Sequence, residues 1–429
     1  MVISTQAAFG RGTRKQFLKK KTKTGGRIRI GVNYLGHSYQ TRLLFTGMPK
    51  RIYTPNEKVF NEVLEEYADQ FEKMIAEGGF IASDGTQMFL INLGLCADWP
   101  ALIKAGKLKR HFNLVQKFVP KKGNIHEGKG ICHICLGGKF PIKWESTAMD
   151  AEWVGTIGEE EAWTEPGALA RVAKYGQSWK YLKFDCWHNG ALGVLNVHVA
   201  STVSVLVTDI ADGNNIDVKI DVVNDHLLEY LSRNKLHVSF QKLTKDNLGW
   251  ATLATFPYGK WSKASDSVIL SVWLEVVLQD KKWENRVADH PVLSLALVAT
   301  KKYNALMSAL HREDYFIFGK QAVTLGAIGM GFMQDLETLA NKCYELGINR
   351  YLFLPKNHAF DHSFRFLLSQ GHEAGVGINP LAESLPMSED FIGTYSRQSR
   401  RVSPRLIMLR SLQSYLIKLR QVWSTPRDQ

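Results

Sequence analysis

Met88-Phe-Leu-Ile-Asn-Leu-Gly-Leu-Cys96, with Asp98 just beyond it, is the stretch that decides how this 429-residue chain folds. Its nearly continuous apolar run is typical of a buried β-strand. A short helical pattern over residues 99–105 follows, and then a basic segment that ends at Cys132-His-Ile-Cys135. An acid at a strand end, followed by a cysteine pair, indicates a metal-dependent reaction centre supported by a second, structural metal.

The elements before this stretch predict a mixed α/β core. Residues 27–33 and 39–45 have the alternation and β-branched content of strands. Residues 57–77 show the clearest helical pattern, because apolar side chains recur at i, i+3, i+4 and i+7 and acids fill the other face. Gly78-Gly79 ends this helix. The order strand, strand, helix, strand is typical of an α/β fold.

Composition limits the classes of protein to which the chain can belong. A hydrophobic content of 45% and a charged content of 22% describe a globular chain that is not disordered. The net charge of +13 favours a polyanionic partner, with nucleic acid ahead of an anionic membrane, although many basic proteins are simply soluble. Five cysteines in a chain of this length do not make a disulfide framework, which favours a reducing, intracellular compartment.

Basic residues gather near both ends. Residues 11–29 carry nine Lys or Arg and no acid, among them Lys19, Lys20 and Lys21. This segment is either an arm on phosphates or a nuclear address, or else a solvated tail. Residues 391–420 carry seven Lys or Arg and no acid, part of them on a predicted helix.

No membrane-spanning segment is expected. The N-terminus lacks the charged-then-apolar pattern of a signal peptide. The most apolar run, residues 191–207, is interrupted by Asn196, His198, Ser201 and Ser204 and predicts a buried helix.

The chain from residue 185 to 350 is predicted to be mainly helical, with helical apolar spacing in four segments: residues 225–234, 264–278, 292–310 and 329–346. The predicted organisation has five parts: a basic arm over 1–29, the first part of the core with the Cys pair over 30–147, a mainly helical insertion over 148–350, the end of the core over 351–403, and a basic helix over 404–429.

The pair Cys132-x2-Cys135 is half of a zinc site, a redox pair or a chance occurrence. Its Lys- and Gly-rich surroundings argue against a redox pair, which needs a helix start after a strand. His358-x3-His362 is the best partner, because this spacing places both imidazoles on one face of a helix. Two thiolates and two imidazoles complete a tetrahedral structural zinc site. The alternative is that each histidine is an ordinary polar side chain.

Two further clusters contain acids. Asp185 and His188 lie three residues apart at a predicted helix start, where they share a hydrogen bond or a metal, or where Asp185 caps the helix; we favour the cap.

Glu389 precedes Arg397, Arg400 and Arg401. It is either a metal ligand beside a phosphate-binding face or a surface acid near a helix start. Asp98 and Glu389 are the candidate catalytic ligands for Mg²⁺ or Mn²⁺, which take carboxylate oxygens from rigid elements.

The order of these motifs resembles the RNase H-like DDE transposases of the CACTA group and, more distantly, the catalytic subunit of the V(D)J recombinase. Ile131-Cys-His-Ile-Cys-Leu136 and Ser388-Glu-Asp-Phe-Ile-Gly393 are also similar to transposase-like proteins of dinoflagellates. The resemblance implies an RNase H-like mixed sheet core interrupted by a large, mainly helical insertion. It also implies a DNA substrate, a nuclear location and a homo-oligomer on DNA.

Carried over by motif, the resemblance makes Asp98 the second catalytic acid and Glu389 the third, with Glu383 and Asp390 as rivals. It makes the Cys pair and the His pair the ligands of a structural Zn²⁺, and it places the segment over 185–193 at the start of the insertion. The first catalytic acid is missing, because no Asp precedes Asp69, which lies within the helix over 57–77.

Asp84 also lies in the wrong place, and the polar end of the first predicted strand is Asn33. Losing one of three metal carboxylates removes most two-metal catalysis. The expected function is therefore a transposase-like DNA-binding protein, derived from a metal-dependent strand-transfer enzyme with an incomplete triad. The alternatives are a non-catalytic, zinc-stabilised nucleic-acid-binding protein and an unrelated α/β enzyme with an incidental Cys pair.

Overall fold

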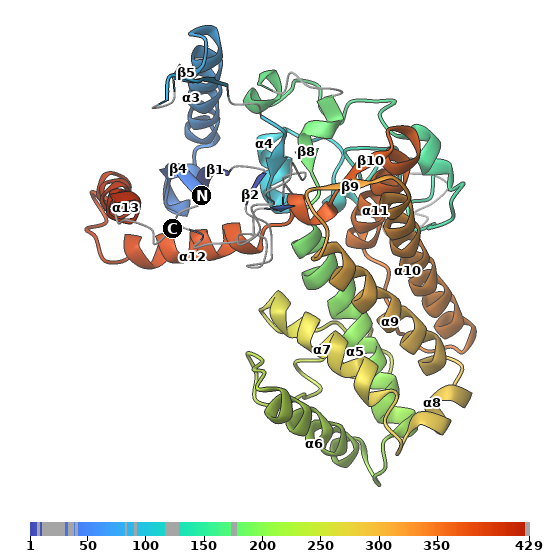
Figure 1. Cartoon of the computed structure of the whole chain (residues 1–429). Helices are drawn as coiled ribbons and strands as arrows, with labels where there is room; N and C mark the ends of the chain where they lie inside the picture. The colour runs from blue at the N-terminus through green and yellow to red at the C-terminus, as the bar shows by residue number, and fades with distance from the viewer. Residues whose placement is uncertain are drawn as a thin grey trace, which may run out of the picture.

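A computed structural model describes residues 1–6, 9–10, 31–32, 38, 42–81, 84–89, 92–115, 128–172 and 178–424. These residues form both helices and small sheets, so the prediction of a mixed α/β chain is confirmed, although helices predominate. A long group of helices occupies one side, and a smaller group that contains α3, α12 and α13 lies on the other (Figure 1).

The described strands pair two by two, in four antiparallel sheets and one parallel sheet. The antiparallel pairs are β1 (Val2–Gln6) with β4 (Arg42–Gly47), β2 (Phe9–Gly10) with β3 (Gly31–Val32), β5 (Phe80–Ile81) with β6 (Gln87–Met88), and β9 (Phe316–Phe318) with β10 (Val376–Ile378). The parallel pair is β7 (Leu95–Cys96) with β8 (Leu182–Lys183). The larger RNase H-like sheet stays a prediction. Val2–Gln6, inside the predicted basic arm, is a strand that the sequence analysis missed.

The prediction of one continuous strand over residues 88–96 is wrong. β6 ends at Met88, and β7 begins only at Leu95. Asn92 breaks the extended path because its Oδ1 accepts a hydrogen bond from the Gly94 backbone N–H at 3.0 Å. Gly94 also has a φ of +148°, which side-chain-bearing residues rarely adopt. Such an Asx turn competes with strand pairing.

The helices α3 (Glu57–Ala76) and α4 (Trp99–Ala105) follow the sequence prediction closely. The short helix α2 (Lys50–Tyr53) is one that the sequence analysis missed. Asn56 caps α3 by accepting a hydrogen bond from the Lys58 N–H, and Gly78, with φ +86°, lies just past its end. The buried stripe of α3 contains Phe60, Leu64 and Ala68, as its helical spacing predicts.

The central part of the chain is a bundle of helices, as predicted. It contains a π-helical turn (Trp187–Val194), α5 (Leu195–Val205), a second π-helical turn (Leu206–Ile210), α6 (Ile216–Asn234), α7 (Ala264–Val277), α8 (Glu284–Asp289), α9 (Leu293–Leu310) and α10 (Gly319–Glu345). Within the described part of the chain, one helix, Trp187–Ile210, is long and apolar enough to cross a membrane, but nearly all of it is buried among other helices. The prediction that residues 191–207 form a buried helix is confirmed.

Three helices close the chain: α11 (Pro355–Glu373), α12 (Pro386–Ser399) and α13 (Ile407–Ser424). α11 lies against α10 (Figure 1). Gly329 permits this close approach, because a Cβ atom there would lie 2.2 Å from the Phe364 ring. The histidine pair is on α11, so the packing of α11 decides where those imidazoles lie.

Three separate clusters of buried apolar side chains hold these elements. The largest joins the bundle to α10 and α11. The second joins α3 and α4 to the region of the Cys pair and to residues 151–184. The third is small and joins β4 to α12 and α13 through Leu44, Phe391 and Tyr415.

His198 in α5 is expected to make stability depend on pH. It is fully buried, its Nε2 lies 2.8 Å from Thr300 Oγ1, and burial lowers its pKa to about 4. Between pH 6.5 and 4 the unfolded chain therefore binds a proton that the folded chain does not. The free energy of unfolding should fall by about 3 kcal/mol as pH drops through this window.

The measurement is urea unfolding of the wild type and of His198→Gln at pH 7, 6, 5 and 4. Gln is expected to keep a donor for Thr300 and to remove this part of the pH slope. Equal slopes for the two proteins would show that His198 titrates at its ordinary pKa.

Candidate metal centre

Cys132, Cys135, His358 and His362 come together in the interior. Their ligand atoms all lie within 4.8 Å of one another, and all four side chains are buried. Cys135 Sγ lies 3.2 Å from His358 Nε2, across 223 residues of sequence. Cys132 Sγ lies 3.5 Å from His362 Nε2, and the two Nε2 atoms are 3.2 Å apart.

These separations match the donor set of a tetrahedral zinc ion. With Zn–S about 2.3 Å and Zn–N about 2.0 Å, sulfur and nitrogen ligands stand about 3.5 Å apart and two nitrogens about 3.3 Å apart. Two sulfur and two nitrogen donors form a closed set, typical of structural sites. Among the described residues, this is the one group of three or more Cys, His, Asp or Glu side chains that converges in this way.

The Cys pair lies in a tight turn shaped to hold thiolates. The backbone N–H groups of Ile134 and Gly137 each donate to a sulfur, Cys132 Sγ and Cys135 Sγ, at 3.3 Å. The Ile131 N–H closes the turn by donating to the Gly137 carbonyl at 2.9 Å. A Cβ atom at Gly137 would lie 3.0 Å from the His358 ring, so glycine leaves room for the imidazole.

The two cysteine thiols are shifted in opposite directions: the pKa of Cys132 is lowered and that of Cys135 is raised. Burial by itself raises the pKa of Cys132, but its hydrogen bonds with Cys135 and the two imidazoles hold that pKa well below the usual range. Burial and the bond to Cys132 raise the pKa of Cys135. The pair is therefore set to hold one thiolate, and a divalent cation would favour both as thiolates.

Separate contacts surround the two imidazoles. The His358 Nδ1–H donates to the Trp144 carbonyl at 3.0 Å, which leaves the Nε2 lone pair facing the sulfurs. Burial lowers the pKa of His362 to about 4, so this ring stays neutral and able to ligate at pH 7. Trp153 packs against both rings, with centroid distances of 4.4 and 4.7 Å.

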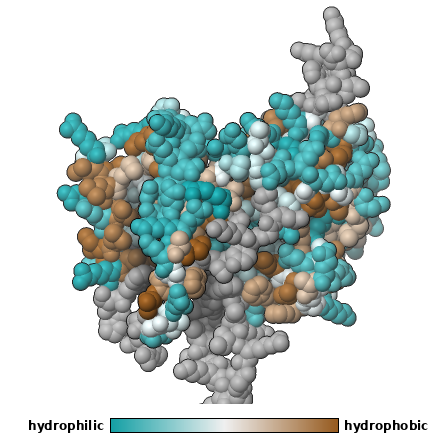
Figure 2. All heavy atoms as spheres, turned by 90° about the horizontal axis from the view of Figure 1, so that it is seen from above, coloured by the Kyte–Doolittle hydropathy of each residue, from teal (hydrophilic) through white to brown (hydrophobic). Residues whose placement is uncertain are grey.

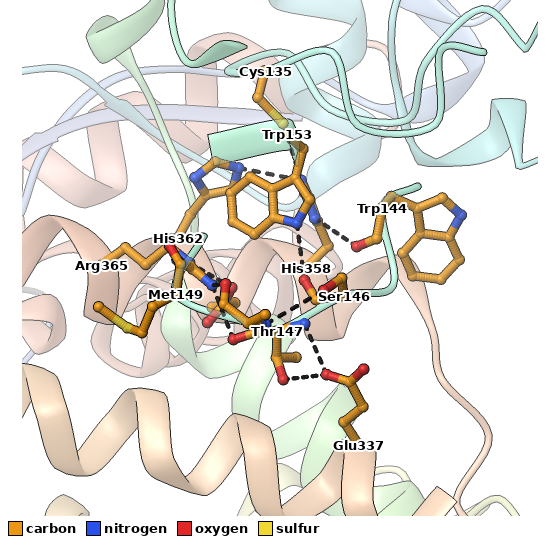
Figure 3. Close-up of polar contacts among 12 residues, drawn as sticks. Cys135, Trp144, Ser146, Thr147, Met149, Trp153, Glu337, His358, His362 and Arg365 are labelled. Atoms are coloured by element: carbon orange, nitrogen blue, oxygen red, sulfur yellow. Dashed lines mark hydrogen bonds and ion pairs between the residues drawn. The ribbon is translucent and has the colours of Figure 1, made fainter. Parts of the chain in front are cut away.

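A second layer of polar contacts braces the site, as Figure 3 shows. Arg365 lies one turn beyond Asp361 on α11 and donates to its carboxylate at 2.8 Å. The same guanidinium donates to the carbonyls of Thr147, Ala148 and Met149 at 2.7–3.1 Å. The strap formed by residues 144–149 thus links the metal ligands to the body of the bundle.

Two further groups complete this layer. Glu337 on α10 accepts hydrogen bonds from the Thr147 N–H, at 2.8 Å, and from its hydroxyl. Arg110 donates to the Cys132 carbonyl at 3.1 Å and to the carbonyls of Glu160 and Glu161. The strap over residues 144–149 is therefore held from α11 and α10, and the cysteine turn is held from the segment that follows α4.

Sequence reasoning missed these supporting residues. Arg365 had a detectable signal, because Asp361-x3-Arg365 has the spacing of a helical ion pair beside the histidines. Trp153 and Trp144 had none, because their contacts with the imidazoles depend on how a loop with little regular structure folds over α11.

The candidate catalytic acids gather at a different place. β7 and β8 are parallel neighbours, and Asp98 and Asp185 each follow the carboxyl end of one strand by two residues. Asp98 is the cap of α4, since its Oδ1 accepts a hydrogen bond from the Ala101 N–H at 2.9 Å. Glu389 lies in the first turn of α12, as predicted.

A histidine, His188, lies between Asp185 and Glu389. His188 bonds to Asp185 through Nδ1, and its Nε2 lies 3.8 Å from Glu389 Oε1. Burial raises the pKa of Glu389; His188 opposes this, and the charges of Asp98 and Asp185 add to it. Burial lowers the pKa of His188. The hydrogen bond to Asp185 and the charges of the surrounding acids outweigh this effect, so the pKa is raised overall.

Asp185 has the capping role that we favoured. Its carboxylate accepts from the backbone N–H groups of Trp187 and His188 at 2.8 and 3.2 Å. It also accepts from the Leu385 N–H at 3.0 Å, just before α12. One buried carboxylate therefore joins the start of the bundle to the helix that carries Glu389.

The other predicted residues are distributed as follows. Glu383 forms an ion pair with Lys183 at 3.1 Å, Asp390 bonds to Ser38, and Asp69 on α3 pairs with Arg171. Arg397, Arg400 and Arg401 are exposed in and just after the last turn of α12. Lys19, Lys20, Lys21 and Asn33 lie outside the described residues.

No protein-family model, no curated protein and no solved structure matches this chain. Its function is therefore argued from the geometry above.

Proposed function

We propose that this chain is a transposase-like DNA-binding protein whose fold is held together by a structural zinc ion. The observation that supports it most is the convergence of Cys132, Cys135, His358 and His362. The types and spacing of these residues in the sequence predict this ligand set, which connects two distant parts of the chain. The proposal includes an RNase H-like core, a nuclear location and a homo-oligomer on DNA.

Zinc in this site would have a structural role. Four protein ligands leave no open position for water or substrate, unlike catalytic zinc sites. The ion would join the cysteine turn to α11, and so the first part of the predicted core to its end. The chain's own contribution is to orient and enclose the ligands: Trp144 and Trp153 contact the imidazoles, and Arg365 holds the strap over residues 144–149.

DNA binding is supported by the basic end of α12 together with the net charge of +13. Arg397, Arg400 and Arg401 are exposed on the helix whose first turn carries Glu389. Each phosphate that they neutralise releases counterions, so binding should weaken steeply with salt.

Fluorescence anisotropy with a duplex, measured from 50 to 300 mM salt, is expected to give a linear log–log dependence. Changing Arg397, Arg400 and Arg401 to Ala should reduce its slope by about two to three units. The matched control changes Lys242, Lys245 and Lys260 to Ala, because these pair with acids of the bundle. Affinity that is independent of salt would count against DNA binding.

A second candidate function is metal-dependent DNA strand cleavage. It is favoured by the placement of Asp98 and Asp185 just beyond the ends of two parallel strands, where the charges of both raise the pKa of Glu389. Mg²⁺ or Mn²⁺ would activate an attacking oxygen between such carboxylates. The test is nicking of supercoiled DNA with either ion by the wild type, Asp98→Ala and Glu389→Ala. Cleavage that both substitutions abolish supports the enzyme, and absence of cleavage by the wild type removes this function.

A further inference from the structure

Helix α13 has two apolar faces, and one of them is buried against the rest of the protein. Tyr415 and Leu419 are buried in the small cluster with Leu44 on β4 and Phe391 on α12. The Tyr415 hydroxyl donates to the Arg42 carbonyl at 2.8 Å. This face fixes α13 on the protein and determines which side of the helix points outward.

The opposite face carries an exposed apolar row. Leu406, Leu409, Leu416 and Ile417 are 45%, 54%, 53% and 60% exposed. Leu406 lies just before α13 and the other three lie on it, and their spacing places them along one side of the helix, over about three turns. Single exposed apolar residues are ordinary, but a row on one helix face is typical of an interaction surface. Figure 2 shows apolar side chains gathered on the left side of the molecule, the side on which α3, α12 and α13 lie in Figure 1.

The charges beside this row are all positive. Arg405, Arg410 and Arg420 are exposed along it, and residues 391–420 contain no acid. A second copy of α13 would therefore place arginines against arginines. DNA would supply phosphates for the arginines but would cover the leucines poorly, because phosphate contacts do not replace apolar burial.

We propose that this face of α13 binds an acidic amphipathic helix of a partner protein. Leu406, Leu409 and Leu416 have the a and d spacing of a heptad, and Gln413 occupies the a position between them. The leucines would pack into an apolar stripe of the partner, and the arginines would pair with acids on its flanks. Arg410 lies beside Gln413, and its guanidinium donates a hydrogen bond to Gln413 Oε1 at 3.0 Å.

The probe is a synthetic 21-residue helix with Leu at a and d and Glu at e and g, labelled for fluorescence anisotropy. The full chain is expected to bind it with a dissociation constant in the micromolar range. Leu409→Ser with Leu416→Ser should weaken binding about tenfold or more, since both anchors lie in the middle of the row. The same peptide with Lys in place of Glu is expected not to bind.

The control protein changes Leu228 and Leu253 to Ser, two leucines that are 45% and 68% exposed elsewhere on the molecule. It should bind the acidic peptide like the wild type, and circular dichroism should show that both variants are folded. DNA affinity of the α13 variant should be unchanged, which separates this proposal from the proposed function.

Three results would overturn the proposal: no binding of the acidic peptide, equal binding by the wild type and the α13 variant, or equal binding of the acidic and basic peptides. If the peptide does not bind, sedimentation and flotation with phosphatidylserine vesicles reveal whether the leucines instead serve a second copy or an anionic membrane.

Discussion

Replacing Cys132 and Cys135 together by serine is expected to remove one equivalent of zinc and to destabilise the protein severely. Structural zinc contributes about 10–16 kcal/mol of binding free energy in small zinc domains. Even a loss of about 5 kcal/mol would lower the unfolding temperature of a chain of this size by roughly 5 °C. Atomic emission measures the metal, and calorimetry measures the unfolding temperature.

The matched control changes Cys96 and Cys343 to serine, because these cysteines lie outside the metal centre. This control is expected to keep one zinc equivalent. Should the first variant fail to fold, titration of the wild type with a chelator gives the same information without a substitution. Absence of stoichiometric zinc in the wild type, or zinc retained after both serine changes, would contradict the site.

Arg365→Leu is expected to destabilise the protein by about 3–5 kcal/mol, because it leaves Asp361 as a buried carboxylate without its partner. Asp361 is 1% exposed, and burial already raises its pKa to about 6 despite Arg365. The substitution also frees the carbonyls of the strap over residues 144–149. The strap carries the Trp144 carbonyl that orients His358, so zinc affinity should fall as well.

A double-mutant cycle with Asp361→Leu isolates the pair, measured by urea unfolding and by competition for zinc. The double variant is expected to recover part of the stability, because two apolar side chains replace an uncompensated charge. Additive losses in the two single variants would show that the ion pair contributes no coupling energy. The strap carbonyls would then carry the whole effect of Arg365.

Local sequence determined most of the helices and some of their ends. α3 and α4 form where the sequence pattern predicts them. His358 and His362 fall on one face of α11 because a helix has 3.6 residues per turn, whatever the rest of the chain does. Strands were harder to predict, because pairing with a distant segment, and not local preference, decides whether an extended run becomes a strand.

The candidate metal centre also has features that follow from the sequence and features that depend on the tertiary structure. Its four ligands were identifiable from ligand type and spacing, because only a few residue types hold zinc and these occurred in two close pairs. The placement of Asp98 and Asp185 after neighbouring strands was not identifiable. It depends on β7 lying parallel to β8, about 90 residues later in the chain. The Asp185 carboxylate also bonds to the Leu385 N–H, just before the helix on which Glu389 lies 3.8 Å from His188.

By itself, then, the sequence determined which residues can ligate a metal and on which helix face they lie, since both follow from chemistry and local geometry. Only the tertiary structure decided that Cys135 and His358 meet within 3.2 Å, and that Arg365 and Trp153 enclose them. It also decided which side of α13 is buried and which is left open. These features arise from contacts between segments far apart in the chain, and local pattern carries no information about which segments will pack.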